Sequence, residues 1–184
     1  MRATPLIKGM FINSHVWALR SAKGEEGVAE LRRRLGRPIS FNNLKDYPVR
    51  EEVELIEVVH ELLYGPSPEE TRSFEAGRLH FKNFITTPFG KILMSALPKT
   101  SDGFRRLLLS VRHIVKHIFK NTNFASEAKE TNKLRIVMEN SDYPIDHFRG
   151  LFYEWQLYWN LDSPQVKAQE LSPGRFEYIL SWSN

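Results

Sequence analysis

The 184-residue sequence contains no cysteine. That absence excludes disulfide bonds, thiolate catalysis, cysteine-ligated zinc and iron–sulfur sites, and haem attached covalently through cysteine. The chain also lacks any apolar run approaching the roughly 18 residues that a transmembrane helix needs. Its opening residues, MRATPLIKGMF, do not contain the apolar core of a secretory signal. We therefore expect a cytoplasmic protein without a membrane span.

A strong charge of one sign is also missing. The formal net charge is +4, from 26 basic and 22 acidic residues. Acidic residues are interleaved with the basic ones, which is more typical of solvated helix faces than of a phosphate-binding surface. Nucleic acid is therefore not the expected partner. The two densest basic groups are Arg32, Arg33, Arg34 and Arg37, and Arg105, Arg106, Arg112 and Lys116.

The remaining composition is that of a globular protein, with 41% hydrophobic and 12% aromatic residues. The length suits a single domain over residues 1–184. Apolar periodicity predicts helices through a part from about 8 to 120, and then a strand–helix–hairpin part from about 133 to 183. This order predicts an α+β fold, in which N-terminal helices pack on a C-terminal antiparallel sheet of strand–helix–strand–strand order. The segments that carry the prediction are a helix at 10–20 with a turn at 24–27, a short candidate strand at 39–41, a continuous helix at 104–118, a polar connection at 121–132, a strand at 134–138, a helix at 144–159 and a hairpin at 165–182.

Several local signals predict where helices begin and end. Gly36 is a suitable helix end, and Thr87 before a proline is a suitable start. Residues 67–70, SPEE, have the form of a capping box with proline at the first helical position. We expect Asp142 or Asp146 to cap the helix that follows Pro144.

The sequence resembles a known family over nearly its whole length, from about Lys8 to Trp182. The resemblance is carried by KGMFINSHVWALRSAKGEEGVAELRRRLG, FEAGRLHFKNFITTPFGKIL, MENSDYPIDHFRGLFYEW and SPGRFEYILSW. These segments look like an uncharacterised paralogous family described mainly from myxobacteria. Membership would imply a fold but no particular activity.

A more distant resemblance has chemistry attached to it. Gly9, Ile12 and Asn13, followed by the turn at 24–27, are similar to the start of haem-nitric-oxide-binding domains. The stretch 74–97 is similar to their next long helix and turn. The same broad fold group contains four-vinyl-reductase-type domains and subunits of vesicle-tethering complexes. The resemblance implies a shared architecture around a central apolar cavity, but it does not decide a function.

In the haem-binding members, a helix equivalent to FRRLLLSVRHIVKHIF supplies the axial histidine. At 100° per residue His113 and His117 lie opposite the apolar stripe of this segment, and the ligand position of the family falls at or near Val115. Valine cannot bind iron. The stripe consists of Phe104, Leu107, Leu108, Val111, Ile114, Val115 and Ile118.

The haem-binding members also neutralise the propionates with a Tyr-x-Ser-x-Arg motif. Alignment on Gly150 places that motif near Val137, Glu139 and Ser141, and none of the three residues matches. A carboxylate at Glu139 would repel a propionate. The comparison predicts that the haem determinants are lost, and that no cofactor is bound.

Two histidine-containing motifs have alternative interpretations. His113 and His117 have the i,i+4 spacing of a zinc-binding pair, but the catalytic glutamate of H-E-x-x-H is missing and Lys116 would repel a cation. We expect an exposed pair and no metal site. Asp146 and His147 are adjacent, so on a helix their side chains do not face each other for acid–base chemistry.

The aromatic residues of the 144–159 helix face those of the last strand. They are typical of a core, and they could equally line an apolar ligand pocket. No nucleophile elbow, phosphate loop or dinucleotide fingerprint is present, so we do not predict an enzyme.

The leading hypothesis is a non-catalytic cytoplasmic regulatory or sensory module that binds a small apolar ligand or a protein partner. The alternatives are a haem-based gas sensor, with His117 or His113 as axial ligand, and a scaffold or homodimerisation module. The residues expected to line a ligand pocket are Phe81, Phe84, Leu108, Val111, Val115, Phe152 and Trp155.

Overall fold

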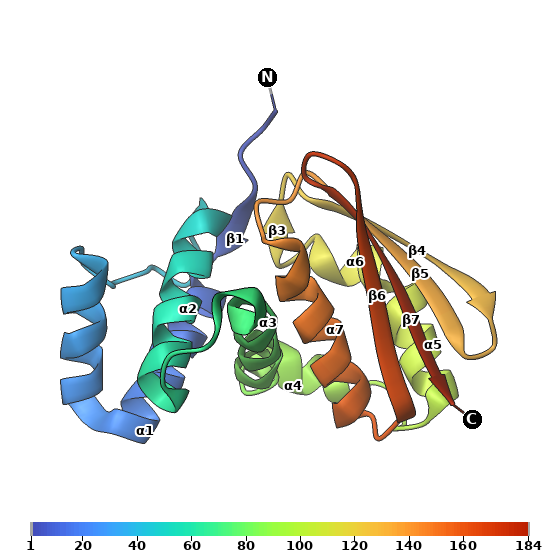
Figure 1. The fold of residues 1–184 in the computed structure, drawn as a ribbon, viewed down its shortest axis with the longest axis horizontal. Coiled ribbons are helices and arrows are strands. Elements are labelled where there is room, and N and C mark those ends of the chain that lie inside the picture. The colour runs from blue at the N-terminus through green and yellow to red at the C-terminus, as the bar shows by residue number, and fades with distance from the viewer. Residues whose placement is uncertain (1, 184) are drawn as a thin grey trace.

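A helical half and a sheet half lie side by side in the computed structural model, which describes residues 2–183 (Figure 1). The long helix α7 lies between α3 and the main sheet. The helices are α1 (Gly9–Leu35), α2 (Val49–Tyr64), α3 (Glu69–Phe84), α4 (Pro88–Ser95), α5 (Ser101–Leu109), α6 (Val111–Val115) and α7 (Ile145–Tyr158). The strands are β1 (Leu6–Lys8), β2 (Asp46–Pro48), β3 (Phe119–Lys120), β4 (Asn123–Glu130), β5 (Lys133–Glu139), β6 (Asp162–Ser172) and β7 (Arg175–Ser183).

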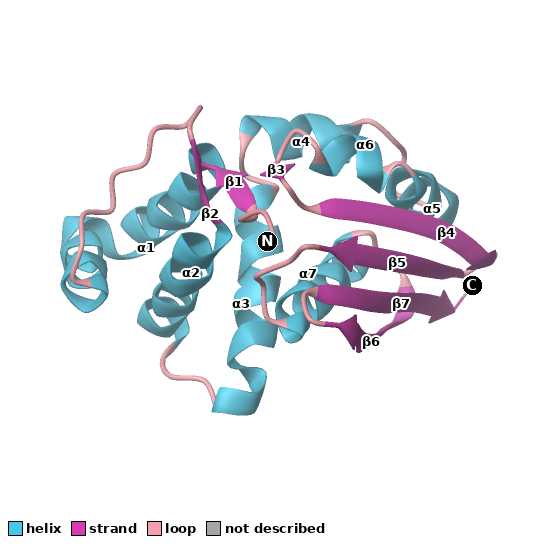
Figure 2. Cartoon of the chain, turned by 90° about the horizontal axis from the view of Figure 1, so that it is seen from above, coloured by secondary structure: helices cyan, strands magenta, loops and turns pink. Residues whose placement is uncertain are grey.

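The main sheet is antiparallel and has the order β4-β5-β7-β6 (Figure 2). Ile136 of β5 lies opposite Tyr178 of β7, and Met138 lies opposite Phe176. Because side chains alternate between the two faces of a strand, these residues share one buried face. The other face is polar, and Arg135 donates to Glu177 across it. Helices α7 and α5 cover the apolar face. The ring centroids of Phe104 in α5 and Trp182 in β7 lie 5.3 Å apart, in an edge-to-face arrangement.

A second, smaller sheet of order β2-β1-β3 joins distant parts of the helical half. Ile7 lies opposite both Tyr47 and Phe119. This sheet ties together the starts of α1 and α2 and the end of the α6 segment. It was not predicted from the sequence, because strands of two or three residues are too short to show a period.

The predicted α+β class is confirmed, and the strand–helix–strand–strand unit gains a strand at its start. The segment 123–130, interpreted as a polar connection, is β4, which pairs with β5 over most of its length. Its pattern alternates around Phe124, but the other seven of its eight residues are polar or small, as expected of an edge strand with one solvated face. The candidate strand at 39–41 is wrong: Ile39 and Phe41 are buried in a loop.

Three helix boundaries agree with the sequence signals. Gly36 follows α1 in the left-handed region, at φ 63°. The Thr87 side chain accepts from the Gly90 backbone N–H at 3.0 Å at the start of α4. The turn at 24–27 is a kink within α1, where Gly24 has φ 64° and ψ −162°.

Other helix predictions are wrong. The continuous helix at 104–118 breaks at Ser110, which leaves the helical region with φ −92° and ψ 2° and divides the segment into α5 and α6. At the start of α3, Ser67 does not cap the helix; its hydroxyl lies 3.4 Å from His60 Nδ1. Neither acidic residue caps α7, because Asp142 pairs with Arg2 and Arg50, and Asp146 pairs with Arg149.

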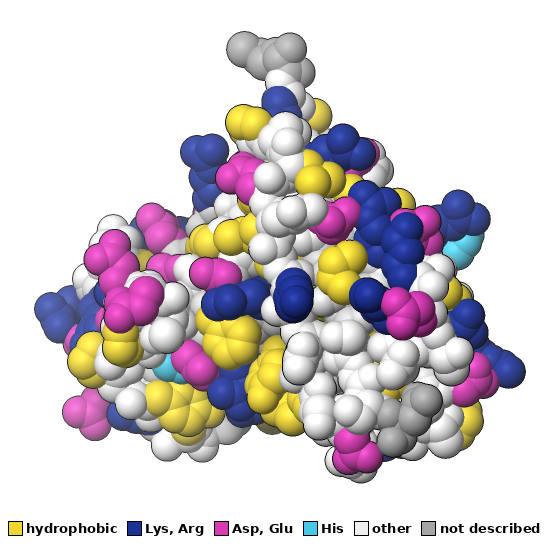
Figure 3. Space-filling view, turned by 45° about the vertical axis from the view of Figure 1, so that its right-hand side comes forward, with side chains coloured by type: hydrophobic (Ala, Val, Ile, Leu, Met, Phe, Trp, Pro, Cys, Tyr) yellow, Lys and Arg dark blue, Asp and Glu magenta, His cyan; other side chains and the backbone are white. Residues whose placement is uncertain are grey.

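The surface carries charges of both signs. On the face in Figure 3, basic side chains lie among acidic ones. Arg33 and Arg34 both contact Glu30, and Arg37 contacts Glu51 at 2.9 Å. Over the described residues, no helix is both long enough and apolar enough to cross a bilayer.

Candidate functional site

A small apolar cavity of about 50 Å³ lies where the helical half meets the sheet half. Its walls come from α3, α4, α6, β4 and α7 and from the residues just after α6. Of the residues that line it, only His80 has a polar side chain. The lining residues are His80, Phe81, Phe84, Leu93, Val111, Ile114, Val115, Ile118, Phe119, Phe124, Phe148, Leu151, Phe152 and Trp155.

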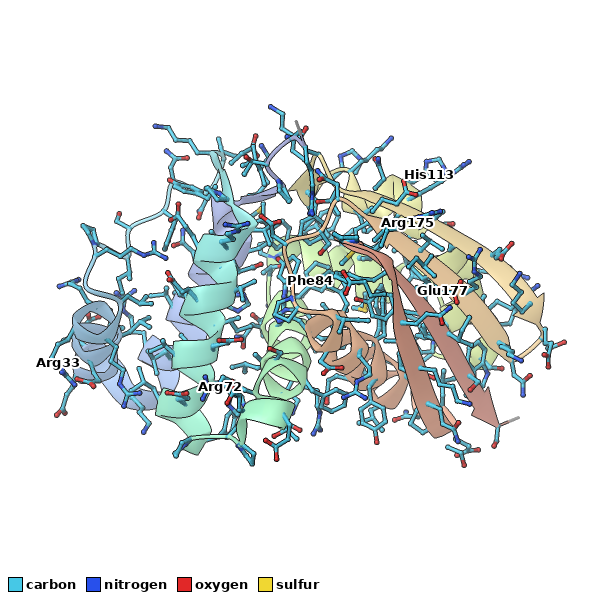
Figure 4. All side chains as sticks on the ribbon, turned by 45° about the horizontal axis from the view of Figure 1, so that its top comes forward. Arg33, Arg72, Phe84, His113, Arg175 and Glu177 are labelled. Atoms are coloured by element: carbon cyan, nitrogen blue, oxygen red, sulfur yellow. The ribbon has the colours of Figure 1, made fainter. Side chains whose placement is uncertain are left out.

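Six of the seven residues expected to line a pocket do line this cavity. The exception is Leu108, which is fully buried but lies outside the lining. Stacked rings narrow the space: the centroids of Phe81 and Trp155 are 5.5 Å apart, and those of Phe152 and Trp155 are 6.5 Å apart. Figure 4 shows Phe84 near the middle of the molecule. That these residues bind a ligand stays a prediction.

The two histidines of the RHIVKHIF segment point away from the cavity. His113 and His117 are both exposed, and Arg112 Nε donates to His113 Nε2 at 3.0 Å. In Figure 4, His113 lies at the periphery. Val115, the residue at the expected ligand position, faces the cavity.

The positions aligned with the propionate clamp have other contacts. Glu139 is exposed and pairs with Arg175 at 3.0 Å. Ser141 is buried, and its hydroxyl accepts from the backbone N–H of Tyr143 at 3.1 Å. Both residues therefore serve local structure at the end of β5.

A buried polar cluster lies beside the cavity, and it was not predicted from the sequence. We call it the histidine–glutamate cluster. Each of its six side chains is at most 5% exposed, and they come from four helices and the loop before α7. Its members are His15 of α1, Glu52 of α2, His80 and Asn83 of α3, Tyr143 of the loop, and His147 of α7.

Glu52 is at the centre of this cluster. Its Oε1 lies 3.1 Å from His15 Nε2 and 3.7 Å from His80 Nε2. Its Oε2 accepts a hydrogen bond from the Tyr143 hydroxyl. The carboxylate therefore contacts groups from α1, α3 and the loop before α7.

The outer nitrogens of the two imidazoles have partners of their own. The Asn83 side-chain amide lies 3.0 Å from His15 Nδ1, and His147 Nε2 lies 2.9 Å from His80 Nδ1. Within residues 2–183, the remaining nitrogen of His147, Nδ1, is buried without a hydrogen-bond partner.

Burial controls the ionisation of the cluster. It lowers the pKa of His15 to about 3 and that of His80 to about 4, although the Glu52 carboxylate opposes the shift at His80. Burial also lowers the pKa of His147 well below its ordinary value. Burial raises the pKa of Glu52, while His80 and the Tyr143 hydroxyl pull it down. At neutral pH the three imidazoles are therefore neutral and able to donate or accept through either nitrogen.

The helical phase carries a signal for this cluster. His15 follows Phe11 by four residues and Ile12 by three, so it lies on the buried face of α1. Glu52 stands three residues before Leu55 and four before Ile56 on the buried face of α2. A polar residue on the apolar face of each of two consecutive helices is the sequence signal that indicates this cluster.

Comparison with known proteins agrees with the fold. Solved structures with this fold include the Fe(II) unliganded H-NOX protein of K. algicida, at 14% identity and a TM-score of 0.63, with 97% of each chain covered. An oxygen-binding H-NOX domain related to soluble guanylate cyclases, in its oxygen complex, matches at 15% identity and a TM-score of 0.67, over 97% of this chain and 96% of that one. A mutant H-NOX of T. tengcongensis matches at 16% identity and a TM-score of 0.64, over 97% and 98%.

At these identities the likeness shows the fold alone. No curated protein matches the sequence. The family described as "Protein of unknown function (DUF2378)" matches residues 2–183. The chain therefore belongs to this family, and it has an H-NOX-like fold.

Proposed function

We propose that this chain is a non-catalytic, cytoplasmic sensory module that binds a small apolar ligand in the cavity between α3, α6 and α7, without haem. The observation that carries the proposal is the cavity lining, which is apolar except for His80. Small-molecule sites are typically concave and mostly apolar, with few polar groups. The H-NOX-like fold supports a sensory role.

The residues present do not fit a haem. The side chain at the expected ligand position is Val115, and the nearby histidines are exposed. A cavity of about 50 Å³ is far smaller than the roughly 300–1,000 Å³ of cofactor and drug-sized sites. The positions of the propionate clamp offer Val137, Glu139 and Ser141, which supply no positive charge. These observations support the loss of the haem determinants.

The size of the cavity indicates the size of the ligand. A dry apolar cavity of about 150 Å³ accepts benzene or xenon, so one of 50 Å³ suits a ligand of very few heavy atoms. An occupant would press on α6, which has only five residues and is followed directly by turn and strand. A shift of α6 against α7 is the change that a partner would read.

Binding of a protein partner is the second candidate. Trp17 is 67% exposed, which is unusual for a tryptophan, and it lines two adjoining surface hollows. Exposed tryptophans are enriched at protein interfaces. A Trp17→Ala variant would lose any self-association seen by sedimentation, without a change in ligand binding.

Xenon is a suitable probe for the cavity. In methyl NMR spectra, xenon pressure is expected to shift signals of residues around Val115 saturably. Val115→Leu fills part of the cavity and should abolish the effect, whereas Val137→Leu, in an equally buried valine outside the lining, should leave it unchanged. An unsaturable response in the native protein, or the same response in both variants, would contradict ligand binding in this cavity.

A haemin titration tests the second part of the proposal. We expect no sharp Soret band in the native protein. A specific band that disappears in His117→Ala or His113→Ala would show that one of these residues is an axial ligand, and the haem-free proposal would fail.

A further inference from the structure

We propose that His15, Glu52 and His80 form a binding site for one divalent first-row transition metal ion, zinc or iron(II). Each residue offers one donor atom, and the three atoms lie within 4.8 Å of one another. Two neutral imidazoles and one carboxylate form the donor set of catalytic zinc sites and of non-haem iron(II) sites. The proposal does not depend on a ligand in the apolar cavity.

The distances suit a common ion. Metal–ligand bonds of about 2.0–2.1 Å in tetrahedral geometry place donor atoms about 3.3 Å apart. In the structure Glu52 Oε1 lies 3.1 Å from His15 Nε2 and 3.7 Å from His80 Nε2. Binding would therefore require side-chain adjustments of only a few tenths of an ångström for these two pairs.

The groups that contact the three proposed ligands are also typical of a metal site. Ligating histidines usually donate their other ring N–H to a neighbouring acceptor, which fixes the tautomer. The Asn83 amide lies beside His15 Nδ1, and its oxygen becomes the acceptor if the amide turns by 180°. His147 Nε2 lies 2.9 Å from His80 Nδ1 and is the acceptor when His80 carries its proton there, and Tyr143 donates to the second oxygen of the carboxylate.

Charge balance supports a cation at this position. Glu52 is fully buried, and within residues 2–183 the basic side chains that contact its carboxylate are the neutral imidazoles of His15 and His80. No lysine or arginine of the described chain pairs with Glu52. No positive side chain at this carboxylate would therefore repel an incoming cation. A buried carboxylate is costly without a positive partner, and a divalent ion supplies one.

A purely structural role explains the cluster poorly. Buried polar networks stabilise a fold when every member is satisfied. Here the Nδ1 atom of His147 has no partner among the described residues, although the residue is fully buried. An unpaired buried nitrogen is a cost to the fold, whereas the contact of His147 with His80 has a use in a metal site, where it holds the ring of a ligand.

Three protein ligands leave at least one coordination position open. His80 belongs both to the proposed ligand set and to the wall of the apolar cavity. A bound ion would fix the His80 ring, and with it one side of the cavity. Metal occupancy and the shape of the cavity are therefore linked through one side chain.

The test begins with the native 184-residue chain, stripped with a chelator and dialysed. We expect it to bind one equivalent of Co²⁺ with visible d–d absorption, and stoichiometric Zn²⁺ to displace this ion. X-ray absorption at the zinc edge should show two imidazole ligands at about 2.0 Å. Binding below one tenth of an equivalent, or a spectrum without paired imidazoles, would overturn the proposal whatever the variants do.

Variants then assign the ligands. Glu52→Gln keeps the shape and an acceptor for Tyr143, and should weaken Zn²⁺ binding by more than about 100-fold, while Asn83→Ala should weaken it by about 10–100-fold. His60→Gln changes a buried histidine of α2 that lies outside the cluster, and this variant should bind Zn²⁺ like the native chain. Unchanged Zn²⁺ binding in a folded Glu52→Gln variant would refute the assignment.

Discussion

Gly77 of α3 lies directly against the backbone carbonyl of His147 in α7, and a Cβ atom at Gly77 would come within 1.8 Å of that oxygen. The contact is reciprocal, because a Cβ at Gly150 of α7 would come within 1.9 Å of the Phe74 carbonyl oxygen in α3. The two glycines let the helix backbones touch. This close approach places His147 at hydrogen-bond distance from His80, and so completes the histidine–glutamate cluster.

We expect Gly77→Ala to destabilise the fold by about 3 kcal/mol or more. Overpacking usually costs about 1–3 kcal/mol, and here the obstacle is backbone rather than a flexible side chain. The gain of about 1 kcal/mol in helix propensity would not offset it. Urea denaturation followed by circular dichroism measures the difference.

Gly36→Ala is the control for that substitution. Gly36 also needs glycine, but for a different reason: it has φ 63°, and an alanine methyl group there would have no atom within 4 Å. Alanine there should cost about 1–2 kcal/mol through backbone strain alone. If Gly77→Ala costs no more than Gly36→Ala, the two helices are not in close contact.

The fold could be predicted where the sequence has a clear period. The predicted hairpin at 165–182 is confirmed, and in its last strand, β7, Phe176, Tyr178, Leu180 and Trp182 alternate with their side chains on the buried face. Strand β4 was missed because edge strands carry little apolar signal. The break at Ser110 was missed because the apolar period continues through it, and the structure shows α6 beyond the break packed against β4.

The lining of the apolar cavity could largely be predicted from the sequence, whereas the histidine–glutamate cluster could not. Cavity residues such as Phe81 and Trp155 follow from helical phase and from the resemblance. The cluster does not, because its members come from four helices and a loop that lie far apart in the sequence, although Glu52 stands four residues before Ile56 on the buried face of α2. His147 contacts His80, which lies 67 residues away in the sequence, so its immediate neighbours do not indicate this contact.

Tyr143→Phe should destabilise the metal-free protein by about 1.5–3 kcal/mol, the range for a hydrogen bond to a charged group. The substitution removes the only donor that the structure gives to Glu52 Oε2 within the described residues. Tyr178→Phe is matched in size and burial, but its hydroxyl donates to a neutral carbonyl, that of Ile145, at 3.1 Å. It should cost only about 0.5–1.5 kcal/mol. Equal losses in urea denaturation would mean that Glu52 is not ionised.

Thr87→Ala should cost about 1–2 kcal/mol, the upper part of the range for helix caps. Thr87 is buried, and its hydroxyl both accepts from the Gly90 N–H and donates to the Phe84 carbonyl. Thr100→Ala removes the similar cap of α5, where the hydroxyl accepts from Gly103 at 3.1 Å and Thr100 is exposed. The smaller loss is expected there, and thermal unfolding of the two variants in parallel gives the comparison.

His60 gives a pH dependence that can be separated from that of the cluster. Burial lowers its pKa, while Glu75 and Glu61 oppose the shift and Lys82 and Arg78 add to it. Because the folded-state pKa lies below the unfolded value of about 6.5, the unfolded chain takes up the proton first. The contribution of neutral His60 is therefore complete above pH 6.5, and it is lost as the pH falls toward the folded-state value.

His60→Gln cannot take up this proton, so the stability gap between the native chain and the variant should be constant from pH 7 to 8. Between pH 6.5 and 5 the native chain should lose stability relative to the variant. The cluster histidines are present in both proteins, so their titration cancels in the difference. Urea denaturation of both proteins at half-unit pH steps measures the gap. A gap that stays constant down to pH 5 would show that His60 titrates alike in the folded and unfolded chains, and that its burial does not favour the neutral form.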